Sequence, residues 1–196
     1  MLLDWEQGLP IMGNASHPVP WAYVVGDRLL EEAHDTMRGM GIPIAAVRMI
    51  PAFGKDNKDL NRIIFAAQEL DPLPELLVIE GFGDLVDMPG HRRQVRDFVS
   101  EVSSWCQSPR DFPNGLTILG VMESPKTKPN ERYKDPRQRI SGCAAWGYHS
   151  STVFIIESEK PDALGHSQRV ISVSMKNSLS FARQGDFDSN GRLVFP

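Results

Sequence analysis

The sequence predicts an α/β protein with a mostly parallel sheet flanked by helices and an antiparallel hairpin at its C-terminal end. Between residues 21 and 157, short apolar runs alternate with segments of helical periodicity, the pattern of a parallel sheet covered by helices on both faces. The runs are apolar at consecutive positions, which is typical of strands buried on both faces. From residue 170 the pattern changes to alternating apolar and polar residues, which indicates antiparallel strands.

The N-terminal part predicts a strand, a helix and a further strand. Residues 21–25 form an almost wholly apolar run that ends in a polar loop, as expected for a buried strand. Apolar residues then recur at helical spacing from residue 30 to residue 40, and Gly41 and Pro43 provide a helix stop. Residues 44–49 can form a second strand.

The central part predicts three more buried strands separated by helices. Apolar residues at positions i, i+3, i+4 and i+7 predict amphipathic helices over residues 60–67 and 95–102. Residues 141–148 form another helix-like stretch. We expect the following runs to be adjacent parallel strands of one sheet: residues 21–25, 76–79, 116–121 and 152–156.

The C-terminal part predicts an antiparallel hairpin or meander. Residues 170–175 alternate apolar and polar side chains, and a turn signal at residues 188–191 precedes an apolar run at residues 193–195.

Composition favours a single cytoplasmic domain over residues 1–196. The chain has 196 residues, of which 41% are hydrophobic and 23% are charged, as in ordinary globular domains. Its formal net charge of -4 excludes a polycationic field, so any basic site is local. The two cysteines lack metal-ligand spacing, the N-terminus has acids where a signal peptide is basic, and no apolar run is long enough for a membrane span. We therefore expect a cytoplasmic protein without a membrane partner.

Acidic residues follow the predicted strands. Asp27 follows the first strand, Glu80 the run at 76–79, Glu123 with Ser124 the run at 116–121, and Glu157 the run at 152–156. The carboxyl ends of parallel strands meet at one sheet edge, where ligands bind, and an acid there can hold the water shell of Mg²⁺. We expect Asp27, Glu80 and Glu123 to converge. The alternative is that each acid merely marks where a strand leaves the core.

Several segments resemble RecA-like ATPases of the branch that contains RepA-type hexameric helicases and related AAA-type proteins. Residues 76–80, Leu-Leu-Val-Ile-Glu, resemble the Walker B strand, and residues 21–28 resemble the strand after the phosphate-loop helix. The same order continues with a sensor-like strand at residues 117–126, an Arg-x-Ser-Gly-like segment at 139–146, and closing segments at 173–177 and 187–194.

This resemblance implies specific roles. Glu80 matches the Walker B acid, catalytic and metal-binding, and Asp27 matches the catalytic carboxylate that orients the attacking water. Glu123 and Ser124 match the sensor, and Lys176 matches the trans-acting lysine. The family uses Mg²⁺ and ATP and assembles as oligomers. Walker B usually carries Asp where this chain has Glu80, and the Arg expected after Asn177 is Ser178, which removes a bidentate donor for the transferring phosphate and weakens the case for hydrolysis.

The phosphate loop of this family, Gly-x-x-x-x-Gly-Lys-Ser/Thr, has no match in the chain. The only Gly-Lys pair, Gly54 and Lys55, fails at both ends of the motif. Residues 2–10 resemble the end of the phosphate-loop helix, which leaves two explanations: Met1 lies within a longer ATPase, or the protein has lost the loop and keeps the fold for another purpose. We expect the 196 residues to bind ATP at best weakly and not to hydrolyse it.

A basic stretch follows the predicted strand at residues 116–121. Residues 126–139 contain six basic residues and two acids, at a place where RecA-like ring proteins bind single-stranded DNA. We expect this stretch to bind single-stranded nucleic acid through its phosphates, the alternative being a solvated loop. The basic residues are Lys126, Lys128, Arg132, Lys134, Arg137 and Arg139.

Two functions remain open on the sequence. The first is a RecA-like ATPase core acting as a homo-oligomer in DNA replication, recombination or mobile-element maintenance. The second is a degenerate non-catalytic module that binds a partner ATPase or another protein.

Overall fold

The chain forms two compact units. The computed structural model describes residues 19–39, 41–43, 45, 47–52, 54, 59–122, 136–138, 140, 145–158, 169–176, 181–187 and 193–194. The first unit comprises Met1–Pro89 and Ser100–Glu123, and the second comprises Gly90–Val99 and Ser124–Pro196. Whether both form the single domain expected from the sequence stays a prediction.

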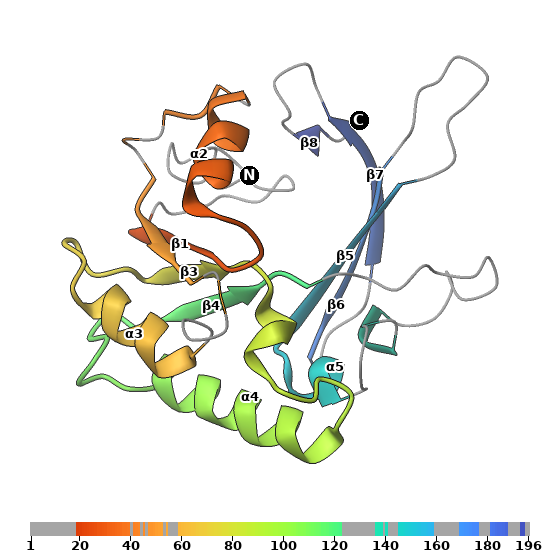
Figure 1. The fold of residues 1–196 in the computed structure, drawn as a ribbon. Coiled ribbons are helices and arrows are strands. Elements are labelled where there is room, and N and C mark those ends of the chain that lie inside the picture. The colour runs from red at the N-terminus through yellow and green to blue at the C-terminus, as the bar shows by residue number, and fades with distance from the viewer. Residues whose placement is uncertain are drawn as a thin grey trace. The chain divides into compact units, whose positions relative to one another are not determined.

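The first unit contains a parallel sheet of four strands in the order β2-β1-β3-β4. Its central strands are the most apolar, since all four residues of β3 are buried, and so are four of the five residues of β1. The predicted α/β class, a parallel sheet flanked by helices with antiparallel strands near the C-terminus, is confirmed (Figure 1). The strands are β1 (Trp21–Val25), β2 (Met49–Pro51), β3 (Leu76–Ile79) and β4 (Thr117–Gly120).

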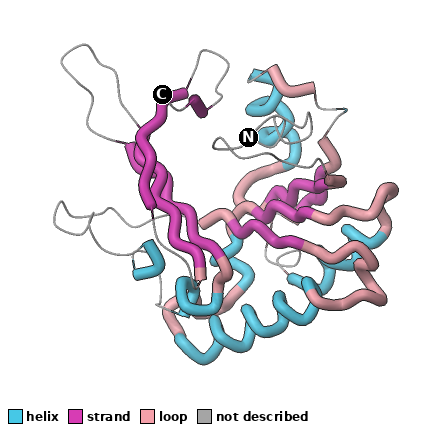
Figure 2. The backbone as a smooth tube through the Cα atoms, turned by 180° about the vertical axis from the view of Figure 1, so that it is seen from behind, coloured by secondary structure: helices cyan, strands magenta, loops and turns pink. Residues whose placement is uncertain are grey.

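Helices cover the sheet on both sides (Figures 1 and 2). Helix α2 (Leu30–Gly39) ends where predicted, because Gly41 adopts a φ of 72° and its N–H donates to the carbonyl of Arg38 at 3.0 Å. Helix α3 (Leu60–Gln68) begins at Asp59, whose carboxylate accepts hydrogen bonds from two first-turn amides. The predicted apolar face of α3 is buried, as is that of α4 (Arg92–Cys106).

One strand of the parallel sheet was predicted wrongly. Residues 152–156 do not join it: β5 (Thr152–Ser158) pairs antiparallel with β6 (Arg169–Met175) in a second sheet. This finding counts against the RecA-like resemblance, which places all four predicted strands in one sheet. Only alternate residues of β5 are buried, while Phe154 and Ile156 are 49% and 54% exposed. A short apolar run does not distinguish a strand buried on one face from one buried on both. The fourth parallel strand is β2, which begins where the predicted strand at 44–49 ends.

Strand β4 is an edge strand of the described sheet rather than a strand buried on both faces. It pairs with β3, and its four residues are exposed or half-buried. The apolar sequence of β4 is compatible with burial on both faces. The exposed fraction of its residues depends instead on its position at the edge of the sheet.

The second unit contains an antiparallel sheet in the order β5-β6-β7-β8. The predicted C-terminal strands are confirmed as β6 and as β8 (Leu193–Val194). Strand β7 (Phe181–Phe187) was not predicted, because its sequence has little apolar alternation. The unit also contains η4 (Pro136–Gln138), α5 (Ala145–His149) and the first part of α4. Residues 141–144 of the predicted helix lie outside the described residues.

Candidate functional site at the edge of the parallel sheet

Asp27 and Glu80 lie at one edge of the parallel sheet because they follow adjacent parallel strands. Strands β1 and β3 pair with Val24 opposite Ile79, and the amide of Glu80 donates to the carbonyl of Val24 at 3.1 Å. This bond continues the ladder one residue past β3 and positions the start of the Glu80 side chain. Glu80 is buried, with 6% of its surface exposed, whereas Asp27 is exposed.

Two glycines permit the close approach of these loops. A Cβ at Gly26 would collide with the carbonyl oxygen of Glu80, and a Cβ at Gly81 would collide with the carboxylate of Asp27. Gly81 also has a φ of 64°, in the left-handed region that favours glycine. The Asp27 carboxylate therefore lies against the backbone that immediately follows Glu80.

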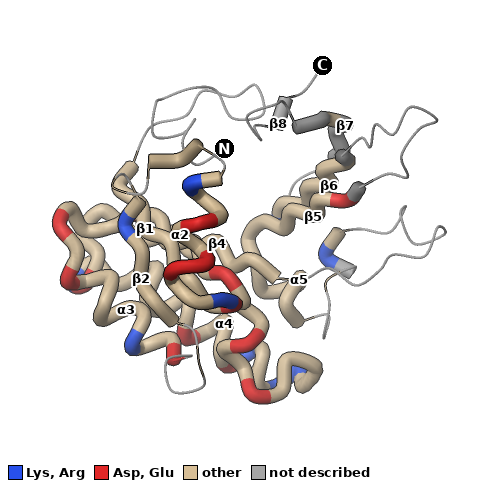
Figure 3. The backbone as a smooth tube through the Cα atoms, turned by 45° about the horizontal axis from the view of Figure 1, so that its top comes forward, with Lys and Arg blue, Asp and Glu red and all other residues tan. Residues whose placement is uncertain are grey.

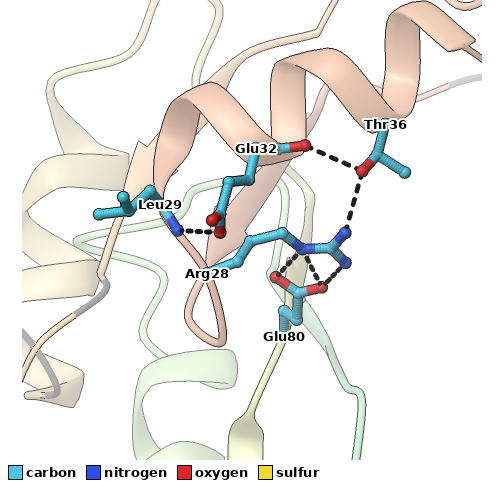
Figure 4. A network of polar contacts seen from close by, with 5 residues as sticks. All are labelled: Arg28, Leu29, Glu32, Thr36 and Glu80. Atoms are coloured by element: carbon cyan, nitrogen blue, oxygen red, sulfur yellow. Dashed lines mark hydrogen bonds and ion pairs between the residues drawn. The ribbon is translucent and has the colours of Figure 1, made fainter.

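Arg28 binds the carboxylate of Glu80 (Figure 4). Its Nε donates to Oε1 at 3.1 Å and to Oε2 at 3.3 Å, and its NH2 group also donates to Oε1. The side chain of Arg28 is 35% exposed and that of Glu80 is 7% exposed. This hydrogen bond is the main reason that the pKa of Arg28 is raised, so the guanidinium keeps its charge and faces the buried carboxylate of Glu80.

The same guanidinium connects the sheet edge to α2 (Figure 4). NH1 of Arg28 donates to Oγ1 of Thr36 at 3.3 Å, and that hydroxyl donates to the carbonyl of Glu32 at 2.8 Å. The carboxylate of Glu32 accepts from the amide of Leu29 at 3.1 Å. Sequence reasoning missed the role of Arg28, although a cation directly after Asp27 was the available signal.

Tyr23 adds a titratable group beside Glu80. The pKa of Tyr23 is raised to about 12, chiefly by burial, and the negative charge of Glu80 raises this pKa by more than Arg28 lowers it. The phenol is therefore neutral over the physiological range, when it can donate a proton to a hydrogen bond with Glu80.

The raised pKa of Tyr23 predicts a loss of stability at high pH. An unfolded tyrosine ionises near pH 10, so the contribution is fully present below that pH and is lost as the pH rises toward about 12. We expect the free energy of unfolding to fall less between pH 9 and 11.5 in Tyr23→Phe than in the wild type. Urea unfolding at both pH values checks this, with the exposed Tyr148→Phe as control. An equal fall in all three proteins would contradict the prediction.

The other predicted site residues are distributed differently. Glu123, Ser124, Lys126, Lys128, Arg132, Lys134 and Arg139 lie outside the described residues. Lys176 is exposed directly after β6 in the second unit, and its amide donates to the carbonyl of Ser151 at 2.7 Å. The trans-acting role of Lys176 stays a prediction.

Arg137 was predicted to bind nucleic acid. In the structure its guanidinium donates hydrogen bonds to other residues of the second unit. Nε donates to Oγ of Ser174 at 3.2 Å, and NH1 donates to the carbonyls of Gly147 and of Ser150, the latter at 2.7 Å. NH2 donates to the carbonyls of Ser151 and Ser174 at 2.8 and 3.3 Å. These bonds match the five N–H donors of an arginine, so Arg137 joins η4, the end of α5 and β6.

The sheet edge carries the carboxylates of Asp27 and Glu80, and that of Glu80 is held in an ion pair with Arg28. Carboxylate oxygens suit Mg²⁺, which keeps several of its own waters and needs few protein ligands. Among the described residues, no group of three His, Cys, Asp or Glu side chains is arranged to hold a metal ion. A cation at this edge would have to compete with Arg28 for the Glu80 carboxylate.

Comparison with protein-family models finds no match for this chain, and comparison with curated proteins finds none either. Of the helices in the described part of the chain, none has the length and apolar character needed to cross a membrane.

Proposed function

We propose that this chain is a RecA-like ATPase core that acts in DNA replication, recombination or mobile-element maintenance. The observation that carries the proposal is the pairing of β1 with β3, which brings Asp27 and Glu80 to the same carboxyl edge of a parallel sheet. In open parallel sheets this edge is the usual ligand site. The proposal includes a cytoplasmic homo-oligomer that binds single-stranded nucleic acid.

In this proposal Glu80 and Asp27 would hold the water shell of Mg²⁺, which would supply positive charge opposite the phosphates of a nucleotide. Glu80 is buried, and its carboxylate already accepts hydrogen bonds from Arg28. Arg28 therefore has to release Glu80 before the acid can hold a hydrated cation. The 196 residues contain no phosphate loop, so we expect ATP alone to bind weakly.

The ion pair also supports the second candidate, a non-catalytic module that binds a partner ATPase or another protein. In that case Arg28 stays paired with Glu80 at all times, and the ion pair stabilises the fold and takes part in no reaction. The two candidates differ in whether the edge binds a cation once Arg28 is removed.

The test is a titration of the ¹⁵N-labelled chain with Mn²⁺ and ATP, followed by paramagnetic broadening of the Gly26 and Gly81 amide signals. For the ATPase core we expect these signals to broaden before those of other residues, and at roughly threefold lower Mn²⁺ in Arg28→Gln because competition for the carboxylate is lost. Asp27→Asn combined with Glu80→Gln should abolish the preference.

Arg38→Gln is the matched control, since Arg38 pairs with Asp35 on the exposed surface of α2 at 2.6 Å. It should leave broadening at Gly26 and Gly81 unchanged. Equal broadening at the exposed acids Glu31 and Glu32, with no preference for the sheet edge even in Arg28→Gln, would contradict the ATPase core and favour the non-catalytic module.

A further inference from the structure

An open cavity with a volume of about 630 Å³ lies at the start of α4, within the second unit. Its lining consists of three arginines, two histidines and a glycine, and none of the proposed ATPase residues is among them. The lining residues are Gly90, His91, Arg92, Arg93, Arg96 and His149.

Packing of α4 against α5 builds this cavity. Val95 is fully buried, and the ring of Phe98 meets that of Trp146 edge-on with 5.9 Å between ring centroids. Trp146 is 2% exposed, so this contact anchors α5 against the first part of α4. His149 at the end of α5 consequently lines the same cavity as the first turns of α4.

Helical spacing gathers the three arginines. Arg92 and Arg96 are four residues apart and Arg93 and Arg96 are three apart, so each pair lies one turn apart on the surface of α4. The same turns contain the positive end of the helix dipole. Because a guanidinium carries a positive charge, the three arginines make the lining of the cavity cationic.

One acid offsets part of this charge. Asp97 accepts a hydrogen bond from NH2 of Arg96 at 3.1 Å and lies 3.7 Å from Nε of Arg93. Basic and acidic positions both occur along this part of the backbone (Figure 3). Within the described part of the chain, Arg92 forms no side-chain hydrogen bond or ion pair, so its donors are available to a ligand.

We propose that this cavity binds phosphate groups. The planar fork of a guanidinium matches two phosphate oxygens. Several arginines together match the double negative charge of a phosphate better than the single charge of a carboxylate ligand. His91 and His149 offer additional N–H donors. The volume is in the range of small-ligand sites. The proposal does not rest on the ATPase function, since Asp27 and Glu80 take no part in it.

The test follows the amide signals of the ¹⁵N-labelled full chain during titration with inorganic phosphate, with sodium chloride at equal ionic strength as reference. We expect shifts centred on residues 90–96 and His149. Arg92→Ala combined with Arg96→Ala should weaken binding at least about tenfold, since each lost charge-assisted bond contributes strongly. Asp97→Asn should strengthen binding about threefold by removing the competing acid.

Arg110→Ala is the matched control, because Arg110 is an exposed arginine that does not line the cavity. Circular dichroism verifies that the variants keep their helices. Shifts no larger with phosphate than with chloride, or an equal loss in Arg110→Ala and the double variant, would overturn the proposal.

A second arm identifies the source of the phosphate. Fluorescence anisotropy with a labelled single-stranded oligothymidylate is measured on the same variants. If binding of the oligonucleotide falls in the double variant and rises in Asp97→Asn, the phosphate comes from nucleic acid. If these variants change the affinity for inorganic phosphate alone, the cavity takes a small phosphorylated ligand.

Discussion

Replacing Arg28 by methionine should lower the free energy of unfolding by about 2–3 kcal/mol. The substitution removes the partner of Glu80, whose side chain is 7% exposed, and leaves a buried carboxylate without its counter-charge. We expect an effect below the range for fully buried pairs because the side chain of Arg28 is itself 35% exposed. Urea unfolding at neutral pH measures the change.

The matched control is Arg38→Met, which breaks the exposed pair between Arg38 and Asp35. Exposed pairs of this kind contribute about 0.5 kcal/mol or less. Adding Glu80→Gln to Arg28→Met should recover part of the loss, since the uncompensated charge disappears. Equal effects of Arg28→Met and Arg38→Met would refute a stabilising role for the pair.

Replacing Arg137 by alanine should lower the free energy of unfolding by about 3 kcal/mol, because partly buried carbonyl oxygens lose their donors. Five bonds from one guanidinium connect three elements of the second unit. Arg137→Lys should restore only part of the stability, since an ammonium group has three donors and lacks the planar fork.

Thermal unfolding and hydrogen exchange measure this effect together. The amide of Lys176 donates to the carbonyl of Ser151, which also accepts from Arg137, so its exchange should accelerate in Arg137→Ala. Arg110→Ala, an exposed arginine of the first unit, should change neither readout. The prediction is wrong if both variants unfold alike.

The elements of the first unit were largely predictable because they depend on local burial. The apolar residues of α3 recur every three to four positions and are the residues buried in the structure. The run at residues 76–79 is β3, buried at every position. The periodicity of apolar residues predicts which side chains become buried, and it can be recognised from a few neighbouring residues.

The candidate site was predictable only in part. Asp27 and Glu80 could be selected because each follows an apolar strand, and adjacent parallel strands end at one edge. The ion pair between Arg28 and Glu80 could not be predicted, since the two residues are 52 positions apart. The role of Arg137 was equally hidden, because a surface cation and a cation bonded to five acceptors have the same sequence signal.

By itself, the sequence determined the α/β class, the principal helices and the acids at the strand ends, all of which follow from local patterns of apolar and polar residues. Only the tertiary structure decided which sheet β5 joins and that β4 is an edge strand of the described sheet. It also decided that Arg28 pairs with Glu80 and that Arg137 donates to backbone carbonyls. The physical reason is that strand pairing and ion pairing join residues far apart in the chain, and their free energy depends on geometry that forms only when distant segments pack together.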